Sequence, residues 1–125
     1  MFLGTRILID AGAVIGAHGA IPATSNVAPA AAAEAWDAAG RGDFVSAARA
    51  QEVVMRYEEM ADIARAGSTE GASFSSMKLI LQQWGVIDSA RLTRPLRSFA
   101  DDEIIELRRR LQDLPHGAQR LAVAA

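Results

Sequence analysis

The sequence predicts an α/β protein that is mostly helical, with its strands confined to the N-terminal part of the chain. Residues Gly19–Ala23 form a short continuous apolar run, which is typical of a buried strand. From Ala30 onward, apolar residues recur at spacings of three and four, which indicates amphipathic helices. The 26 alanines favour helix wherever packing does not decide.

The composition limits the possible functions. The chain has 125 residues, half of them hydrophobic, and a net charge of −2, so it can bury a core and gives no reason to expect nucleic acid or an anionic membrane as partner. It contains no cysteine, which excludes disulfides and thiolate chemistry and fits a cytoplasmic protein. Glycine, histidine and proline interrupt the apolar stretch 7–23, so we expect neither a signal peptide nor a membrane span.

The first segment, residues 1–42, is expected to hold the strands. Met1–Gly4 resembles the end of a buried strand, and the apolar pattern from Thr5 to Ile15 predicts a helix. The strand Gly19–Ala23 follows, and Thr24-Ser25-Asn26 supplies residue types that cap helices. Pro29 suits a first helical turn, so we expect a helix that ends at Gly40.

The second segment, residues 43–114, is expected to be helical, and residues 115–125 to form a flexible tail. Asp43 is a natural N-cap for a helix from Phe44 to Ala64, whose apolar stripe includes Tyr57. Gly67–Gly71 is predicted as a loop, and a further helix as running from Ser73 to Trp84.

Arg91–Pro95 is predicted as an extended linker, because the residue before proline disfavours helix. Ser98–Asp101 resembles a capping box for the last helix. The buried stripe of that helix is expected at Ile104, Leu107, Leu111 and Leu114. The whole order of elements matches the last turn of a (β/α)8 barrel followed by a helical extension.

Few residues offer chemistry of their own. Thr24-Ser25-Asn26 follows a strand at the end where barrels place their active sites, but the same residues could serve only as helix caps. Lys78 is the only lysine. It lies in the middle of a predicted helix rather than in a pocket that would lower its pKa, so we do not expect it to form a Schiff base.

Metal and cofactor sites are not expected. His18 is predicted to lie in a turn and His116 in the tail, and neither has acidic or histidine neighbours at metal-ligand spacing. The glycines match no dinucleotide-binding pattern. Arg108-Arg109-Arg110 shares its helix with acidic residues, which indicates a solvated mixed-charge face, and Asp101-Asp102-Glu103 suits the positive end of the helix dipole.

The stretch Gly16–Pro29 resembles the eighth-strand motif of the dihydrodipicolinate synthase/N-acetylneuraminate lyase family. In that family a Gly-x-x-Gly-x-Ile segment runs into an Asn-Val-Ala ending, as Gly19-Ala20-Ile21 runs into Asn26-Val27-Ala28 here. Ala39–Asp43, Phe74–Gly85 and Arg91–Leu96 match later family segments in the same order. The resemblance covers the chain to about Leu114.

The resemblance implies a (β/α)8 barrel with a C-terminal helical extension, of which this chain would hold the end of strand 7, helix 7, strand 8, helix 8 and the extension. Family members are lyases that act on pyruvate or another 2-oxo acid through a lysine Schiff base, without a cofactor, and usually form homotetramers. The family's catalytic lysine and tyrosine lie on strands that this chain lacks, so it is expected to be inactive alone.

The resemblance assigns two substrate-binding residues and no catalytic or metal-binding residue. Ile21 corresponds to the strand-8 isoleucine beside the pyruvate, and Gly4 to the glycine that closes strand 7. Gly4-Thr5-Arg6 replaces an acidic-flanked glycine, which leaves the second substrate open. Tyr57 lies on a helix stripe and does not correspond to the catalytic tyrosine.

An alternative is a helical interaction module derived from that family. The two readings differ in one observable property. A barrel fragment would expose the barrel-facing side chains of Phe2, Leu3, Ile7 and Ile21, and contiguous apolar surface of that kind associates.

Overall fold

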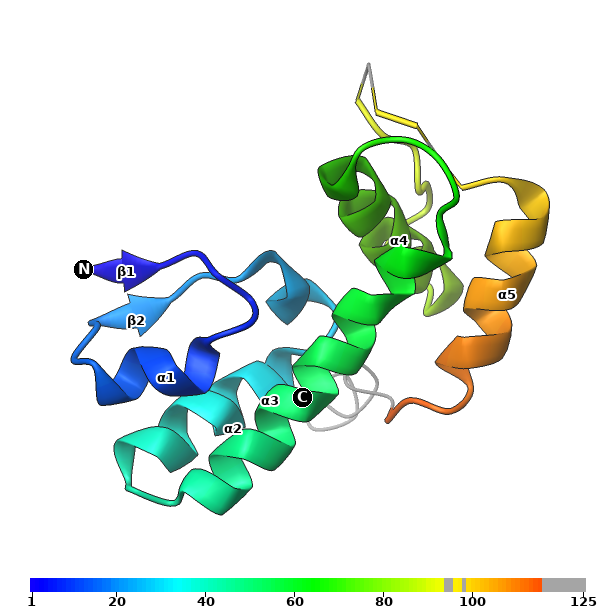
Figure 1. The fold of residues 1–125 in the computed structure, drawn as a ribbon. Coiled ribbons are helices and arrows are strands. Elements are labelled where there is room, and N and C mark those ends of the chain that lie inside the picture. The colour runs from blue at the N-terminus through cyan, green and yellow to red at the C-terminus, as the bar shows by residue number, and fades with distance from the viewer. Residues whose placement is uncertain (94–95, 98, 116–125) are drawn as a thin grey trace. The chain divides into compact units, whose positions relative to one another are not determined.

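The computed structural model describes residues 1–93, 96–97 and 99–115 (Figure 1). They form two compact units, Met1–Tyr57 and Glu58–Pro115. No helix among the described residues is long and apolar enough to cross a membrane. Apart from Pro115, the predicted tail lies outside the described residues, as does His116, and the predicted boundary between residues 42 and 43 stays a prediction.

The first unit begins with two short parallel strands joined by a helix (Figure 1). Strand β1 (Phe2–Leu3) pairs with β2 (Gly19–Ala20), and α1 (Ile9–Val14) lies between them in the chain. The register places Leu3 opposite Ala20, and the Ile21 N–H donates to the Leu3 carbonyl at 2.7 Å. The predicted strand–helix–strand order is therefore observed, although the helix is shorter than expected from Thr5–Ile15.

The prediction that Gly19–Ala23 is buried was wrong for part of the segment. Gly19 and Ala20 are half-buried and Ile21 is 71% exposed. A two-stranded sheet explains this exposure, because a strand becomes buried only when neighbouring strands and layers cover it.

Helix α2 (Pro29–Gly40) follows a 3₁₀ turn over Ala23–Asn26. Pro29 occupies the first helical turn as predicted, but the prediction that Thr24-Ser25-Asn26 caps this helix was wrong. These residues are the 3₁₀ turn itself, and Ala28, which has no polar side chain, is the N-cap. Ser25 Oγ instead donates to the Pro22 carbonyl at 2.6 Å, which uses its hydroxyl within the turn.

Helix α3 (Phe44–Glu58) begins at the predicted cap, where the Ser46 N–H donates to Asp43 Oδ1 at 3.1 Å. The Ser46 hydrogen bonds also lower the pKa of Asp43. Gly42 precedes the cap with φ of 80°, a conformation that favours glycine. The α-helix ends at Glu58 rather than Ala64, and a 3₁₀ segment, Glu59–Ile63, continues the chain.

In the second unit, helix α4 (Thr69–Gln83) starts inside the predicted loop. Its N-cap is Ser68, whose Oγ accepts the Gly71 N–H at 3.0 Å. Gly71 is buried, and a Cβ there would lie 3.1 Å from Ser68 Oγ, so the glycine permits the cap. Gly85, with φ of 71°, follows the helix as predicted.

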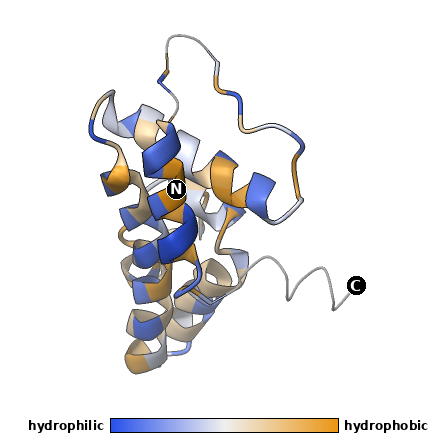
Figure 2. Ribbon diagram, turned by 90° about the vertical axis from the view of Figure 1, so that its right-hand side faces the viewer, coloured by the Kyte–Doolittle hydropathy of each residue, from blue (hydrophilic) through white to orange (hydrophobic). Residues whose placement is uncertain are grey.

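Helix α5 (Asp101–Leu111) buries Leu107 and Leu111, and Leu114 beyond it, as predicted, while Ile104 is half-buried. Figure 2 shows hydrophobic and hydrophilic residues alternating along the helices, as amphipathic helices require. Of the predicted capping box, Ser98 lies outside the described residues. Glu103 supplies the other half, because its Oε2 accepts the Ala100 N–H at 2.7 Å.

Asp101, Asp102 and Glu103 lie in the first turn of α5, as the predicted match to the helix dipole requires, and Glu103 has a further, buried role. Its side chain is 1% exposed and accepts hydrogen bonds from the Arg65 N–H at 2.9 Å and from Arg97 Nη1 at 3.2 Å. The two backbone hydrogen bonds, from Arg65 and Ala100, lower its pKa to about 2. Glu103 thus joins α5 to the segments on either side of α4.

Candidate functional site

The residues after β1 and β2 form the candidate site. Gly4 and Ile21 each directly follow a strand, and the two strands are parallel and in register. Both residues therefore lie at the carboxyl ends of the strands, where open and closed α/β sheets bind their ligands. This end of the strand pair is called the strand edge below. Gly4 is exposed, and no described atom outside its neighbours lies within 4 Å of where its Cβ would be.

The loop after Gly4 is held by hydrogen bonds at both ends. At the strand end, the Leu3 carbonyl accepts the Ile21 N–H. Within the loop, the Ile7 N–H donates to Thr5 Oγ1 at 3.4 Å. At the helix end, the Arg6 carbonyl accepts Gln51 Nε2 from α3 at 2.9 Å.

Gln51 is the residue that sequence reasoning missed. Its side chain is buried, and its Oε1 accepts the N–H groups of Ile9 and Asp10. A signal was present in the sequence, because Gln51 lies four residues after Ala47 and three before Val54, on the apolar stripe of α3. A polar side chain at a core position needs hydrogen-bond partners, and these come from a segment more than 40 residues away.

The polar segment Thr24-Ser25-Asn26 forms the turn after β2, and Ser25 and Asn26 hydrogen-bond within it. Thr24 is fully buried. Asn26 Nδ2 donates to the Ala23 carbonyl at 2.8 Å, and Ser25 Oγ is bonded to the Pro22 carbonyl. The polar atoms of Ser25 and Asn26 thus stabilise the turn that follows β2.

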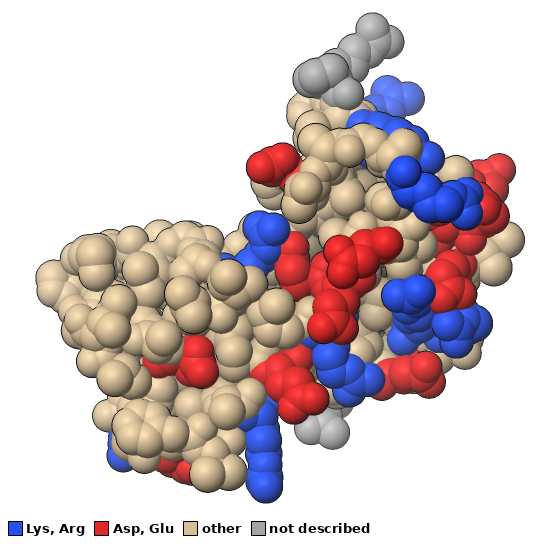
Figure 3. Space-filling view, in the orientation of Figure 1, with Lys and Arg blue, Asp and Glu red and all other residues tan. Residues whose placement is uncertain are grey.

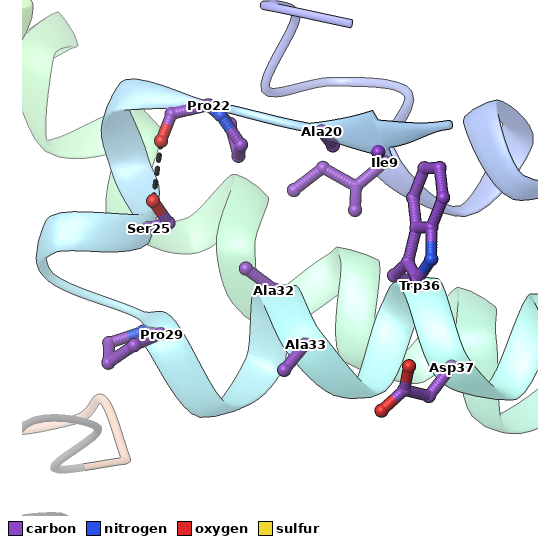
Figure 4. Close-up of a pocket in the computed structure, with 10 residues that line it drawn as sticks. Ile9, Ala20, Pro22, Ser25, Pro29, Ala32, Ala33, Trp36 and Asp37 are labelled. Atoms are coloured by element: carbon purple, nitrogen blue, oxygen red, sulfur yellow. Dashed lines mark hydrogen bonds between the residues drawn. The ribbon is translucent and has the colours of Figure 1, made fainter. Parts of the chain in front are cut away.

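A cavity of about 420 Å³ lies beside β2 (Figure 4). Ile9, Ala20 and Trp36 lie at one end, and Pro22, Ser25 and Pro29 lie at the other. Its lining is mainly apolar and includes no lysine, histidine or tyrosine among the described residues. The cavity supplies mainly apolar contact surface; the polar side chains of its lining include Ser25, whose hydroxyl donates to the Pro22 carbonyl, and Asp37.

Charge is sparse around the strands. Arg6 and Asp10 are the only Asp, Glu, Lys or Arg residues in positions 1–33. Figure 3 shows basic and acidic side chains gathered over the unit Glu58–Pro115, while the visible face of the unit Met1–Tyr57 is largely uncharged. The described residues contain no group of three His, Asp or Glu side chains that could hold a metal.

The remaining candidate residues lie in helices or turns. Lys78 Nζ on α4 donates to the Arg91 carbonyl at 2.7 Å, so its ammonium holds a loop of the second unit. His18 is exposed in the turn before β2, where its backbone N–H donates to the Met1 carbonyl at 2.8 Å. Tyr57 is buried on the α3 stripe, as predicted.

Three solved structures illustrate what the fold is similar to. Dihydrodipicolinate synthase from Bacteroides thetaiotaomicron superposes with a TM-score of 0.80 at 24% identity, over 91% of this chain and 37% of that one. A variant of 2-keto-3-deoxygluconate aldolase from Sulfolobus solfataricus superposes with a TM-score of 0.71 at 20% identity, over 90% of this chain and 36% of that one. The same aldolase in complex with D-KDPG gives 0.72 at 20% identity, again over 90% of this chain.

This chain thus spans little more than a third of the length of these solved structures. Its helices and two parallel strands match part of the barrel fold that they share. No curated protein matches the sequence. The sequence profile of the Dihydrodipicolinate synthetase family, however, matches residues 1–114. That match shows that the chain belongs to the Dihydrodipicolinate synthetase family.

Proposed function

We propose that the chain is the C-terminal portion of a lyase, an aldolase or synthase, that acts on pyruvate or another 2-oxo acid through a lysine Schiff base. In this assignment β1, α1, β2 and α2 are the end of strand 7, helix 7, strand 8 and helix 8 of a (β/α)8 barrel. The observation that carries the proposal is the position of Gly4 and Ile21, side by side at the carboxyl edge of a parallel pair in a member of this family.

Gly4 and Ile21 would form one wall of the 2-oxo acid pocket. Gly4 leaves space for the substrate, because it has no side chain and no described atom fills its Cβ position. Ile21 contributes an exposed apolar surface that would contact the pyruvate methyl group. The imine-forming lysine and the proton-shuttling tyrosine would come from strands outside this chain. Without them, this chain would be inactive by itself.

The exposed apolar side chains of the first unit support this assignment. Phe2 is 65% exposed, and Ile7, Leu8 and Ile21 are each at least half exposed. Each strand of the pair also has one edge that no other described strand covers. The remaining strands of the barrel would cover these uncovered edges and apolar side chains, since this chain matches only 37% of the Bacteroides enzyme. The complete enzyme would be a cytoplasmic homo-oligomer, a tetramer as usual in the family.

Borohydride trapping tests the mechanism. The chain alone, incubated with pyruvate and borohydride, should keep its mass. Lys78 lies on α4, its Nζ donates to the Arg91 carbonyl, and it is distant from Gly4 and Ile21 in the sequence. In a chimera, residues 1–114 would replace the matching part of the Bacteroides enzyme. A folded chimera should gain the mass of a reduced pyruvate adduct on a lysine of the host segment.

Two results would contradict the proposal. One is an adduct on Lys78 in the chain alone, which would make the chain a catalyst by itself. The other is a chimera that folds, as shown by circular dichroism and a cooperative melt, but traps no pyruvate. A Lys78→Arg variant of the chimera is the matched control and should trap as well as its parent.

A second candidate function is a non-catalytic helical interaction or oligomerisation module. The compact second unit favours it, because Ile80, Leu107 and Leu111 form a buried core of its own and Glu103 adds a buried hydrogen-bonded anchor. Size-exclusion chromatography separates the two. A barrel fragment should associate as its concentration rises, and a folded monomer at all concentrations would count against the fragment assignment.

A further inference from the structure

We propose that Gln51 is a positioning residue that holds the loop after Gly4 in the shape the pocket edge requires. The inference rests on the proposed function of that edge. Gln51 lies on α3, which the sequence assigns to the helical extension, while the loop belongs to the strand–helix–strand unit. A side chain of the extension segment would therefore determine part of the pocket wall.

Gln51 makes three hydrogen bonds to one short segment. Its Oε1 accepts the Ile9 N–H at 3.0 Å and the Asp10 N–H at 3.4 Å, and its Nε2 donates to the Arg6 carbonyl at 2.9 Å. The side chain is 8% exposed, so water does not readily replace these partners. The amide is oriented by its partners, because only one of its two ends can accept an N–H.

Helix α1 needs this contact. The first N–H groups of any helix lack partners within the helix, and the N-cap here is Leu8, whose side chain cannot accept a hydrogen bond. Ile9 is 1% exposed, so its N–H depends on Gln51. With six residues, α1 is too short to form without tertiary contacts.

The loop between Gly4 and α1 is consequently held at two points. The Leu3–Ile21 backbone hydrogen bond holds it at the strand, and Gln51 holds it at Arg6 and at the start of α1. Only a few residues separate these two points from Gly4. Loss of Gln51 would therefore free the segment from Arg6 to the start of α1, while the Leu3–Ile21 hydrogen bond still holds the segment before Gly4.

Glutamine suits this role because the amide at the end of its side chain supplies both an acceptor, Oε1, and a donor, Nε2. Methionine has nearly the same length and lacks both. A glutamate carboxylate keeps the acceptors but presents an oxygen to the Arg6 carbonyl. Protonated glutamic acid restores the donor, so it can make all of the contacts. Gln51→Glu should therefore behave like the parent only at low pH.

The test is hydrogen exchange and amide chemical shifts in the full chain, followed by NMR. In Gln51→Met the Ile9 and Asp10 amides should exchange at least about tenfold faster, and the Gly4 and Arg6 amide shifts should move. Gln82→Met is the matched control, because it removes an exposed glutamine bond to Asp88 in the second unit and should leave these amides unchanged.

In Gln51→Glu the same measurements are made from about pH 4 to about pH 8, across and above the ordinary glutamate pKa of about 4.3. The Gly4 and Arg6 shifts should approach parental values at the acid end and depart from them as the new carboxyl ionises. The charged groups next to it are Arg6 and Asp10 in the loop and helix, and Glu52 on α3. The parent chain, measured over the same range, is the reference for shift changes that do not come from residue 51.

Unchanged exchange at Ile9 and Asp10 in a folded Gln51→Met would overturn the proposal. If Gln51→Met does not fold, Gln51→Glu is the deciding variant. Gly4 and Arg6 amide shifts in Gln51→Glu that equal those of the parent at every pH would then overturn the proposal. A merely structural core residue would not produce a pH-dependent return of the Gly4 shift. No readout involves pyruvate or an imine, so failure of this inference and failure of the proposed function are separately visible.

Discussion

Replacement of Glu103 should change how the stability of the second unit depends on pH. The Glu103 carboxylate is buried and accepts hydrogen bonds from the Arg65 and Ala100 N–H groups and from Arg97. Its pKa in the folded chain is about 2, against an ordinary value of 4.5. Because folding lowers this pKa, the carboxylate stabilises the fold above about pH 4.5, and that stabilisation is lost as pH falls from 4.5 toward 2.

In Glu103→Gln one acceptor oxygen becomes an N–H₂ group that faces donors, which is also the situation of protonated Glu103. We therefore expect the melting temperature of the variant to lie below that of the parent near neutral pH. The difference in melting temperature should narrow steadily between about pH 4.5 and pH 2. Over this interval the parent loses the stabilisation from its Glu103 carboxylate, which the variant lacks at every pH. Thermal melts followed by circular dichroism at a series of pH values measure this gap.

Glu106→Gln is the matched control. Arg109 and Arg110 lower the pKa of Glu106 to about 2 as well, but the Glu106 side chain is 34% exposed and its partners are more so. Water and salt screen such pairs, so this variant should change the melting temperature little, and less still at high salt. A Glu103→Gln gap that stays constant with pH, or a Glu106→Gln gap of equal size, would refute the reasoning.

Three further predictions concern packing, backbone and surface. Ile80→Ala should lower the free energy of unfolding by about 2–5 kcal/mol, seen as a lower urea midpoint, because Ile80 is fully buried. Gly42→Ala should lower the free energy of unfolding by about 1–2 kcal/mol, because φ is 80° at this position and a side chain strains such a backbone. Gly40→Ala is the control, since a Cβ meets no atom at either position but Gly40 has no positive φ, and it should leave the free energy of unfolding unchanged. Ile21→Asp should weaken concentration-dependent association in size-exclusion chromatography, while Ile105→Asp, equally exposed on α5, should not.

The helices of this protein were largely predictable because their signals are local. Pro29 in a first turn, Asp43 as a cap and the glycine after α4 act through neighbours within a few residues. The errors occurred where two local choices compete. Thr24-Ser25-Asn26 can cap a helix or close a turn, and their bonds to Pro22 and Ala23 close the turn.

Part of the candidate site was also predictable. A helix between two short apolar segments indicated a strand–helix–strand unit, and the family resemblance then assigned Gly4 and Ile21 to the pocket. The structure shows that the two strands pair in parallel, with Leu3 opposite Ala20. The contact of these residues with a substrate stays a prediction. The apolar run Gly19–Ala23 by itself predicted burial of Ile21, whereas the fragment hypothesis predicted its exposure, and Ile21 is exposed. Burial of a strand depends on neighbouring strands, which the apolar run does not specify.

By itself, the sequence determined the order of the elements, most helix ends and the family, since each depends on residue type and short-range spacing. Only the tertiary structure decided the roles of Gln51 and Glu103. Both are buried polar residues on amphipathic helices, and each has a hydrogen-bond partner far away in the chain: Arg6 is 45 residues from Gln51, and Arg65 is 38 residues from Glu103. Burial of a polar side chain is favourable only when such distant partners satisfy it, and no local pattern records which segments meet.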